Sequence, residues 1–311
     1  MFLFFFLIIL FFLLDIFFIR LYNISKLVFI NSSGGDCMNL KKATYLLVIT
    51  LLSVGVLSGC GHTPQAQKDT TKPLQVCTNA TFVPFEFKDD ANATEYKGFE
   101  MDLLQAVSKE MGQPIALNNV PFAGIIPALQ QGTMDLGASG ITLSPERAEK
   151  VAFSAPFYES KLVLMVPASG SIHSIQDLKN KTVAVQMGTT AADYCDSKKL
   201  ATKQFDHNSE VIMELQVGGS PAGILDKPVA DYYLTKEGKG KFKIIDLPDA
   251  KGEYLAFAMN KNNPQLQKDI DAALLKLKKN GTFQKIYQKW FGTNCPNLPD
   301  SAAAALAQTA K

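Results

Sequence analysis

An apolar run passes directly into a helix start in the stretch Thr182-Val183-Ala184-Val185-Gln186-Met187-Gly188-Thr189-Thr190. The β-branched and small apolar residues at its beginning predict a buried strand. Gly188 permits a turn, and Thr189 is a residue type that caps helices. The stretch therefore predicts one strand-to-helix unit of an α/β protein.

The same alternation extends in both directions along the chain. Residues 74–78 form an apolar strand pattern, residues 125–129 a short helix pattern, residues 135–138 a strand end and residues 175–178 a helical turn. One face of a further helix carries Leu103, Leu104, Val107 and Met111. Strands that alternate with helices predict mostly parallel sheets covered by helices, so the expected fold class is α/β.

Two helices are expected near the C-terminus. The first has an apolar stripe of Leu266, Ile270, Leu274 and Leu277 and ends at Asn280-Gly281. We expect Thr282 to cap the second helix, whose apolar face contains Phe283, Ile286, Tyr287 and Trp290. Residues 293–311, including Ala302 to Ala305, carry no fold signal and are expected to form a tail.

Composition indicates a globular protein without a nucleic-acid partner. The 311 residues are 47% hydrophobic, which is enough to build a sizeable core. Lys and Arg number 31 and Asp and Glu number 29, so the formal net charge is only +2. No strong field attracts a nucleic acid, and no nucleic-acid partner is expected.

A secretory signal precedes the predicted fold. Residues 38–59 contain the basic pair Lys41-Lys42, an apolar segment from Ala43 to Leu57 and small residues before Cys60. The sequence Leu57-Ser58-Gly59-Cys60 resembles the bacterial lipobox, in which the cysteine thiol takes a diacylglycerol. A transmembrane helix ending in Cys60 is the alternative, but the apolar segment is shorter than the roughly 20 residues that a span requires. We expect an extracytoplasmic protein anchored to the bacterial membrane through lipid on Cys60.

Residues 1–37 contain a second apolar run, from Met1 to Arg20. Gly34-Gly35-Asp36 is what a purine-rich ribosome-binding sequence would encode just ahead of Met38. Residues 1–37 are therefore predicted to be an untranslated or mis-assigned extension, with an additional membrane anchor as the alternative. After Cys60, residues 60–73 are polar and predict a flexible tether.

Three cysteines, Cys77, Cys195 and Cys295, lie in the predicted fold. They form no CxxC motif and have no histidine at metal-binding spacing, so we expect no zinc and no cofactor. One disulfide among them is possible in an exported protein, but the spacing does not select a pair.

Several collinear segments resemble the polar amino-acid-binding proteins of ABC importers. These segments are 79–87, 98–103, 122–129, 140–142, 145–147, 185–190, 224–226 and 280–292. The resemblance implies a type II periplasmic-binding-protein-like fold: lobe 1 from residues 74–159 plus 254–292, and lobe 2 from residues 160–253. Two hinge strands are implied near residues 160–166 and 251–259. The implied protein is a monomer that works with an ABC permease and its ATPase.

A free amino acid presents a carboxylate and an ammonium group on one carbon. Arg147 has the planar guanidinium that pairs with carboxylates, and the resemblance implies that it is the carboxylate clamp. Thr189 and Thr190 stand at a helix start, where free backbone N–H groups could hold the same anion. Asp226 follows an apolar strand, and the resemblance assigns it to the ammonium group.

The remaining implied site residues surround the ligand. The Gly140 carbonyl and the Thr142 hydroxyl complete the ammonium site, and Ser139 is a further implied ligand-binding residue. Phe82 and Phe122 form aromatic walls around the ligand side chain. Asn79 and Gln186 stand where relatives commonly carry charged residues. Because both are neutral amides, they favour an uncharged polar ligand such as glutamine, while arginine stays open.

Two other functions use the same scaffold. An enzyme, such as a dehydratase, would need an acid or base in the cleft; His173 and His207 lie in polar, loop-like stretches, and no catalytic motif is found, so we expect a protein that is not an enzyme. A sensory module would use the same cleft, and the sequence of this chain does not separate sensing from transport.

Overall fold

The computed structural model describes residues 72–90, 92–236 and 238–309, all within one compact unit, Asp69–Lys311. The predicted extension 1–37, signal peptide 38–59, lipidation site Cys60 and tether up to residue 71 lie outside the described residues. Among the helices of the described part, none combines the length and the apolar character needed to span a bilayer.

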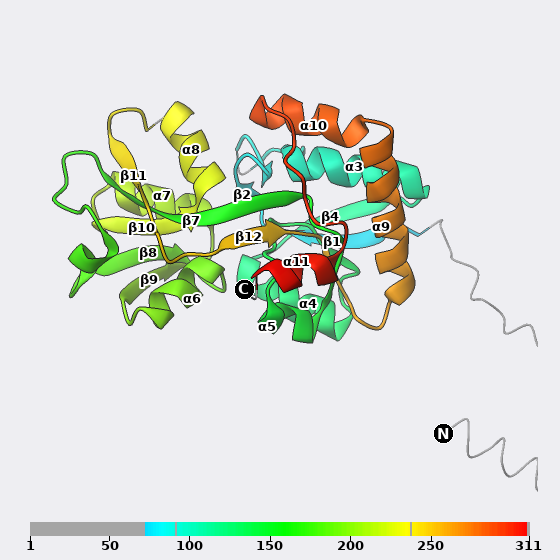
Figure 1. Cartoon of the computed structure of the whole chain (residues 1–311), viewed down its shortest axis with the longest axis horizontal. Helices are drawn as coiled ribbons and strands as arrows, with labels where there is room; N and C mark the ends of the chain where they lie inside the picture. Colours follow the sequence, from blue (N-terminus) through cyan, green and yellow to red (C-terminus); the bar gives the residue numbers. More distant parts are fainter. Residues whose placement is uncertain (1–71, 91, 237, 310–311) are drawn as a thin grey trace, which may run out of the picture. The chain divides into compact units, whose positions relative to one another are not determined.

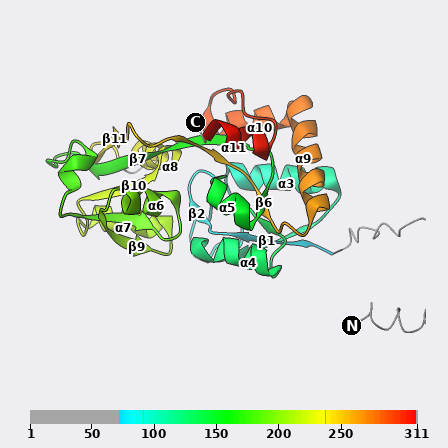
Figure 2. The same ribbon diagram turned by 60° about the horizontal axis from the view of Figure 1, so that its bottom comes forward.

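The first lobe is built on a sheet with the strand order β4-β1-β5-β13-β6. Strands β1, β4 and β5 run parallel to one another, and β13 is antiparallel to β5 and β6. Helices α3 and α4 lie on opposite sides of this sheet (Figures 1 and 2). The elements are β1 (Leu74–Thr78), β2 (Thr81–Phe82), β3 (Glu86–Phe87), α3 (Phe99–Met111), β4 (Ile115–Asn119), η2 (Phe122–Gly124), α4 (Ile125–Gln131), β5 (Leu136–Gly137), α5 (Pro145–Lys150), β6 (Ala152–Phe153), β13 (Ala258–Met259), α9 (Pro264–Lys279) and α10 (Thr282–Phe291).

The second lobe is built on a sheet with the order β11-β7-β10-β8-β9. Its strands β10, β8 and β9 are parallel, whereas β7 and β11 run antiparallel to their neighbours. Helices α6 and α8 cover opposite sides of the sheet (Figure 1). The elements are β7 (Tyr158–Pro167), η3 (Ile175–Leu178), β8 (Thr182–Gln186), α6 (Thr190–Ser197), β9 (Ala201–Phe205), α7 (Asn208–Gln216), β10 (Ala222–Asp226), α8 (Lys227–Lys236) and β11 (Phe242–Asp246).

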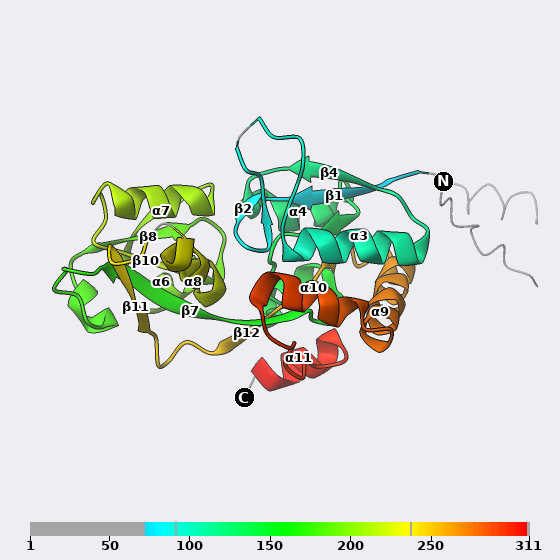
Figure 3. The same ribbon diagram turned by 90° about the horizontal axis from the view of Figure 1, so that it is seen from above.

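Strands β7 and β12 (Gly252–Leu255) connect the lobes. The two strands lie side by side (Figure 3) and pair antiparallel. Leu255 lies opposite Tyr158, and Gly252 lies opposite Lys161. Beyond this pairing, β7 continues into the second lobe, where it pairs with β10 and β11, and the chain after β12 enters the first-lobe sheet at β13. A change in twist along this ribbon can therefore alter the angle between the lobes. The resemblance implied hinge strands near residues 160–166 and 251–259, and the paired strands span residues 158–167 and 252–255.

Each lobe has a core that explains its apolar pattern. In the second lobe, Val183, Val185 and Ile224 are buried between the sheet and its helices. In the first lobe, Phe99 is fully buried and meets Tyr287 edge to face, with ring centroids 5.6 Å apart. The predicted stripe Leu266, Ile270, Leu274 and Leu277 is buried along α9, as its helical spacing requires.

The prediction of an unstructured tail at residues 293–311 was wrong. Helix α11 (Ala302–Thr309) packs against β12, and its Ala305 is fully buried. The hydroxyl of Tyr254 on β12 donates to Gln308 Oε1 at 2.7 Å. Alanine has the highest helix propensity, so this run forms a helix once β12 provides a surface for its small side chains.

The expectation that Thr282 caps α10 was also wrong. Thr282 is the first residue of the helix, and Gly281 is the cap, with a left-handed backbone at φ 78°. Asn280 Oδ1 accepts the hydrogen bond from the Thr282 backbone N–H at 3.0 Å. Asn280 and Gly281 thus end α9 and start α10 together, because glycine adopts a positive φ without steric cost.

The cysteines of the described residues are free thiols. Cys77 and Cys195 are buried in different lobes, and Cys295 is partly exposed. Of the disulfides that the sequence left open, none is formed among these three residues.

Candidate functional site

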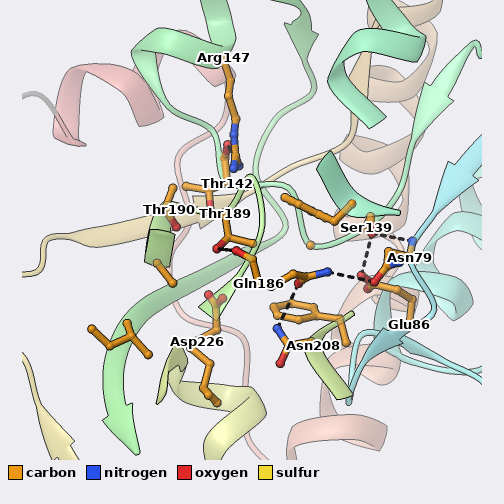
Figure 4. A pocket seen from close by; sticks show the side chains of 16 residues that line it. Asn79, Glu86, Ser139, Thr142, Arg147, Gln186, Thr189, Thr190, Asn208 and Asp226 are labelled. Carbon is orange, nitrogen blue, oxygen red and sulfur yellow. Dashed lines mark hydrogen bonds between the residues drawn. The ribbon is translucent and has the colours of Figure 1, made fainter. Parts of the chain in front are cut away.

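The predicted site residues gather around one cavity where the strand ends of the two lobes meet (Figure 4). The cavity is narrow and partly open to solvent. Its lining contains every residue that the sequence analysis assigned to the ligand: Asn79, Phe82, Phe122, Ser139, Gly140, Thr142, Arg147, Gln186, Thr189, Thr190 and Asp226. Glu86, Ala191, Asn208, Ile224 and Leu225 complete the lining and were not predicted.

Arg147 is placed in the cavity by the first turn of α5. Ser144 caps this helix by accepting from the Arg147 backbone N–H at 3.2 Å. The guanidinium donates to the carbonyl oxygens of Thr142 at 3.1 Å and Gly188 at 2.9 Å. Its carbon lies 5.5 Å from the ring centroid of Phe122, so Phe122 supports the guanidinium as well as lining the cavity.

The charge of Arg147 is not matched by a close carboxylate. The residue is only 8% exposed, and burial lowers its pKa, while the negative charge of Glu253 opposes this shift. Within the described residues, no carboxylate oxygen lies within 4.0 Å of its guanidinium nitrogens. A buried cation without an ion pair is costly, so this group is suited to an anion supplied by a ligand.

The turn from β8 into α6 forms the opposite wall. Thr189 caps α6, accepting from Ala192 N, and its hydroxyl donates to the Gln186 carbonyl at 2.7 Å. Gly188 adopts φ 73°, and a Cβ built there would lie 3.0 Å from Ala123 Cβ of the first lobe. Glycine is therefore required both by the backbone and by the close approach of the two lobes.

Asp226 is the last residue of β10 and projects from the second lobe into the cavity. Its Oδ1 accepts from the Ser160 hydroxyl at 2.6 Å. Burial, followed by the negative charge of Glu253, raises its pKa to about 7, whereas Arg147 acts in the opposite direction. A ligand cation at this carboxylate would favour its ionised form.

Glu253 is a feature of the site that the sequence analysis missed. It lies on the hinge strand β12, and its Oε2 accepts from the Thr142 hydroxyl at 3.0 Å and the Thr190 hydroxyl at 3.1 Å. Burial raises its pKa, while both hydroxyls and Arg147 lower it. In the sequence, Glu253 belongs to an ordinary strand pattern, and only the pairing of β12 brings it behind the cavity.

Two buried acids support the loop that carries Ser139 and Gly140. Ser139 Oγ donates to Glu86 Oε1 at 3.2 Å, and Gly140 N donates to Glu100 Oε2 at 2.7 Å. Burial raises the pKa of Glu86 well above its usual value and that of Glu100 to about 7. Both acids stand within the segments that carry the resemblance, so their positions were a signal that the sequence analysis did not use.

The two acids also act on each other. Glu86 Oε2 and Glu100 Oε1 are buried and have no hydrogen-bond partner among the described groups, and each carboxyl perturbs the pKa of the other. One proton held between the two carboxyls would satisfy both oxygens and remove one buried charge.

The amides of Asn79 and Gln186 bond to each other across the cavity. Gln186 Nε2 donates to Asn79 Oδ1 at 3.1 Å, and Asn208 Nδ2 donates to Gln186 Oε1 at 3.3 Å. Asn79 Nδ2 donates to the Val120 carbonyl at 2.8 Å and lies 2.9 Å from His207 Nδ1. Much of the bonding capacity of these amides is thus used between the lobes, so they join the lobes as well as facing a ligand.

Phe82 forms the aromatic side of the cavity. It is 8% exposed and stacks on Phe85, with ring centroids 5.1 Å apart. A Cβ on Gly140 would come within 2.4 Å of the Phe82 ring, so the glycine allows the ring to lie against the loop. One face of Phe82 is therefore packed, and its position is set by the core.

A cavity between two α/β lobes, with a buried cation on one lobe and a carboxylate on the other, defines a two-lobed ligand-binding protein. Residues 74–293 match the bacterial extracellular solute-binding proteins, family 3, and the chain belongs to this family. Its fold is the type II periplasmic-binding-protein fold.

The chain is also similar to individual members of this family. The chain is 30% identical to the arginine-binding extracellular protein ArtP of Bacillus subtilis (strain 168), over 81% of this chain and 98% of ArtP. It is 32% identical to the putative ABC transporter arginine-binding protein 2 of Escherichia coli (strain K12), over 70% of this chain and 90% of that protein. A solved structure of an ancestral arginine-binding protein bound to glutamine has 38% identity and a TM-score of 0.66, covering 71% of this chain and 98% of that one. These relatives are binding proteins.

Proposed function

We propose that this protein captures a free polar amino acid between its lobes and delivers it to the permease and ATPase of an ABC importer. The observation that carries the proposal is the buried guanidinium of Arg147 on the first lobe, which forms no ion pair with any described residue and faces the same cavity as Asp226 on the second lobe. The carboxylate of an amino-acid zwitterion complements the cation of Arg147, and its ammonium group complements the carboxylate of Asp226. Binding both ends of the ligand would stabilise the closed arrangement of the lobes.

The side chain of the ligand is proposed to be polar. Asn79 and Gln186 add no charge to the cavity, which favours an uncharged ligand such as glutamine. The names of the relatives in Bacillus subtilis and Escherichia coli support arginine. The ancestral protein, named for arginine and solved with glutamine, supports a site that accepts either. Glutamine and arginine are therefore the two ligands to test first.

We further propose that the protein is a monomer held at the extracytoplasmic face of the membrane by a diacylglycerol on Cys60. Two acyl chains give stable anchoring, whereas a single chain binds a membrane only marginally. The anchor would keep the receptor beside its permease. We propose binding without catalysis, which agrees with the names of the relatives.

A thermal-shift screen of the fragment Asp69–Lys311, one compact unit, against the free amino acids tests the proposal. A ligand present at about 100 times its Kd adds about 2.7 kcal/mol to the free energy of unfolding, which is readily detected. We expect glutamine or arginine to raise Tm by several degrees. The absence of a shift with every amino acid would refute the proposed function.

A further inference from the structure

One carboxylate oxygen on the hinge joins two hydroxyls from opposite lobes. Glu253 Oε2 accepts from Thr142 Oγ1 of the first lobe and from Thr190 Oγ1 of the second, at 3.0 and 3.1 Å. Both threonines line the cavity, whereas Glu253 lies behind them and does not line it. Glu253 therefore touches the residues that surround the ligand rather than the ligand space itself.

The Thr142 side of this arrangement is fixed by backbone pairing. Thr142 forms a β-bridge with Leu255, and Leu143 N donates to the Tyr254 carbonyl at 2.8 Å. Thr142 and Glu253 thus belong to neighbouring stretches of one paired region. Thr190 is the first residue of α6 and moves with the second lobe. Its bond to Glu253 consequently joins the second lobe to the hinge.

The protons of the cavity threonines can be assigned. A threonine hydroxyl has one proton to donate, and an ionised carboxylate can only accept. Thr142 and Thr190 donate theirs to Glu253, and Thr189 donates its proton to the Gln186 carbonyl. All three hydroxyl oxygens can then act toward a ligand only as acceptors.

Acceptors and donors suit different ends of an amino acid. The ammonium group needs acceptors, and hydroxyl oxygens with committed protons supply them. The carboxylate needs donors, which leaves the Arg147 guanidinium and backbone N–H groups to bind it. Burial raises the pKa of Glu253, and the two threonine hydroxyls and the charge of Arg147 oppose this shift. The ionised form of Glu253 is the one that accepts both hydroxyl protons.

We propose that Glu253 is a positioning residue that holds the Thr142 and Thr190 hydroxyls as acceptors for the ammonium group of the ligand. This assignment rests on the proposed amino-acid binding. The hinge strand then contributes to the specificity of the site. Through the two threonine hydroxyls, Glu253 favours a ligand with an α-ammonium group over one without it.

The test compares ligands that differ only in that group. L-Arginine, L-glutamine and their desamino analogues are titrated into the wild type, Glu253→Ala and Glu253→Gln by calorimetry, with displacement or NMR titration for weak binding. Glu159→Gln is the matched control, because Glu159 is an exposed glutamate on β7, opposite Tyr254 in the same hinge ribbon. Tm without ligand and circular dichroism report on folding.

We expect Glu253→Ala to weaken binding of the amino acid by about tenfold or more, the scale of a lost hydrogen bond to a charged group. The desamino analogue should lose less than about twofold, since it makes no such bond. Glu253→Gln keeps the shape and one acceptor oxygen, so it should give a smaller loss, again confined to the amino acid. If Glu253→Ala does not fold, Glu253→Gln is compared with the wild type instead. Glu159→Gln should bind like the wild type.

Two results would overturn the assignment while leaving the proposed function intact. One is an equal loss for the amino acid and its desamino analogue, which would mean that Glu253 acts on the hinge or on folding. The other is unchanged affinity in both Glu253 variants. A wild type that binds none of the free amino acids would instead refute the proposed function, and the assignment of Glu253 with it.

Discussion

Arg147 and Gly188 belong to different lobes, and the Arg147 guanidinium donates to the Gly188 carbonyl at 2.9 Å. The group that we propose as the carboxylate clamp therefore also joins the lobes directly. Its remaining donors can bind a ligand carboxylate in the same closed arrangement. Closure and capture are linked through this one side chain, and the first prediction concerns it.

Replacing Arg147 with lysine should abolish tight binding. Lysine keeps the positive charge but not the planar set of donors that can reach Thr142, Gly188 and a carboxylate together. We expect Arg147→Lys to weaken amino-acid binding by about 100-fold, near the upper range for a charged hydrogen bond. Calorimetric titration measures this, and Lys150→Ala on the exposed side of the same helix is the control. Equal affinity of Arg147→Lys and wild type would contradict the clamp.

Amino-acid binding should weaken as the pH falls below 7. Burial raises the pKa of Asp226 to about 7, so a growing fraction of sites is protonated below that pH. The ligand ammonium requires the ionised carboxylate, so binding must release a proton, and affinity should fall by up to about tenfold per pH unit. Calorimetry in buffers of different ionisation enthalpy counts this proton. Asp226→Asn should weaken binding strongly, and the binding that is left should release no proton; an unchanged proton count for that binding would exclude Asp226 as the source.

The buried pair Glu86 and Glu100 should make the fold less stable in alkali. A carboxyl whose pKa is raised in the folded state binds more protons there than in the unfolded chain, so it stabilises the fold at low pH. For Glu100 this contribution is present below about pH 4.5 and is lost as the pH rises through about 7. Glu100→Gln removes the titrating group. Its Tm should therefore fall less than that of the wild type between pH 5 and pH 8, and parallel Tm curves would contradict the prediction.

Gly188→Ala should impair ligand binding beyond its effect on the backbone. A Cβ at this position would lie 3.0 Å from Ala123 Cβ of the other lobe, which hinders closure. Gly218→Ala is a matched control, because Gly218 has φ 71° and its Cβ would meet nothing within 4 Å. Each variant should lose about 1 kcal/mol of stability from the positive φ. Only Gly188→Ala should weaken binding in titrations; similar affinities for the two variants would argue against the contact.

Ala305→Glu should destabilise the protein through α11. Ala305 is fully buried, and its helix packs against the hinge strand. A glutamate at this position either loses the hydration of its carboxylate or forces α11 away from β12. We expect a loss of about 2–3 kcal/mol, or several degrees in Tm. Ala304→Glu is the control, since Ala304 is exposed on the same helix. Equal Tm values for the two variants would mean that α11 does not contribute to stability.

Local patterns were sufficient to predict most elements. The alternation of strand and helix, the stripe on α9 and the strand-to-helix turn at Thr189 all depend on neighbours in the chain. Residues 302–309 could not be predicted in this way, because an alanine run becomes a helix only where another element covers it. The position of the α10 cap was predicted wrongly because both Thr282 and Gly281 are residue types that can precede a helix. The left-handed backbone at Gly281 places the cap there and makes Thr282 the first helical residue.

The amino-acid sequence by itself determined the α/β class and the residue types at the cavity, since Arg147 and Asp226 stand in short segments with recognisable order. Tertiary structure decided which partners each side chain has. It placed Glu253 of the hinge between Thr142 and Thr190, joined Asn79 to Gln186, and buried Glu86 beside Glu100. These groups are far apart along the chain. Their hydrogen bonds and charges therefore exist only after the sheets have formed and the two lobes have closed on one another.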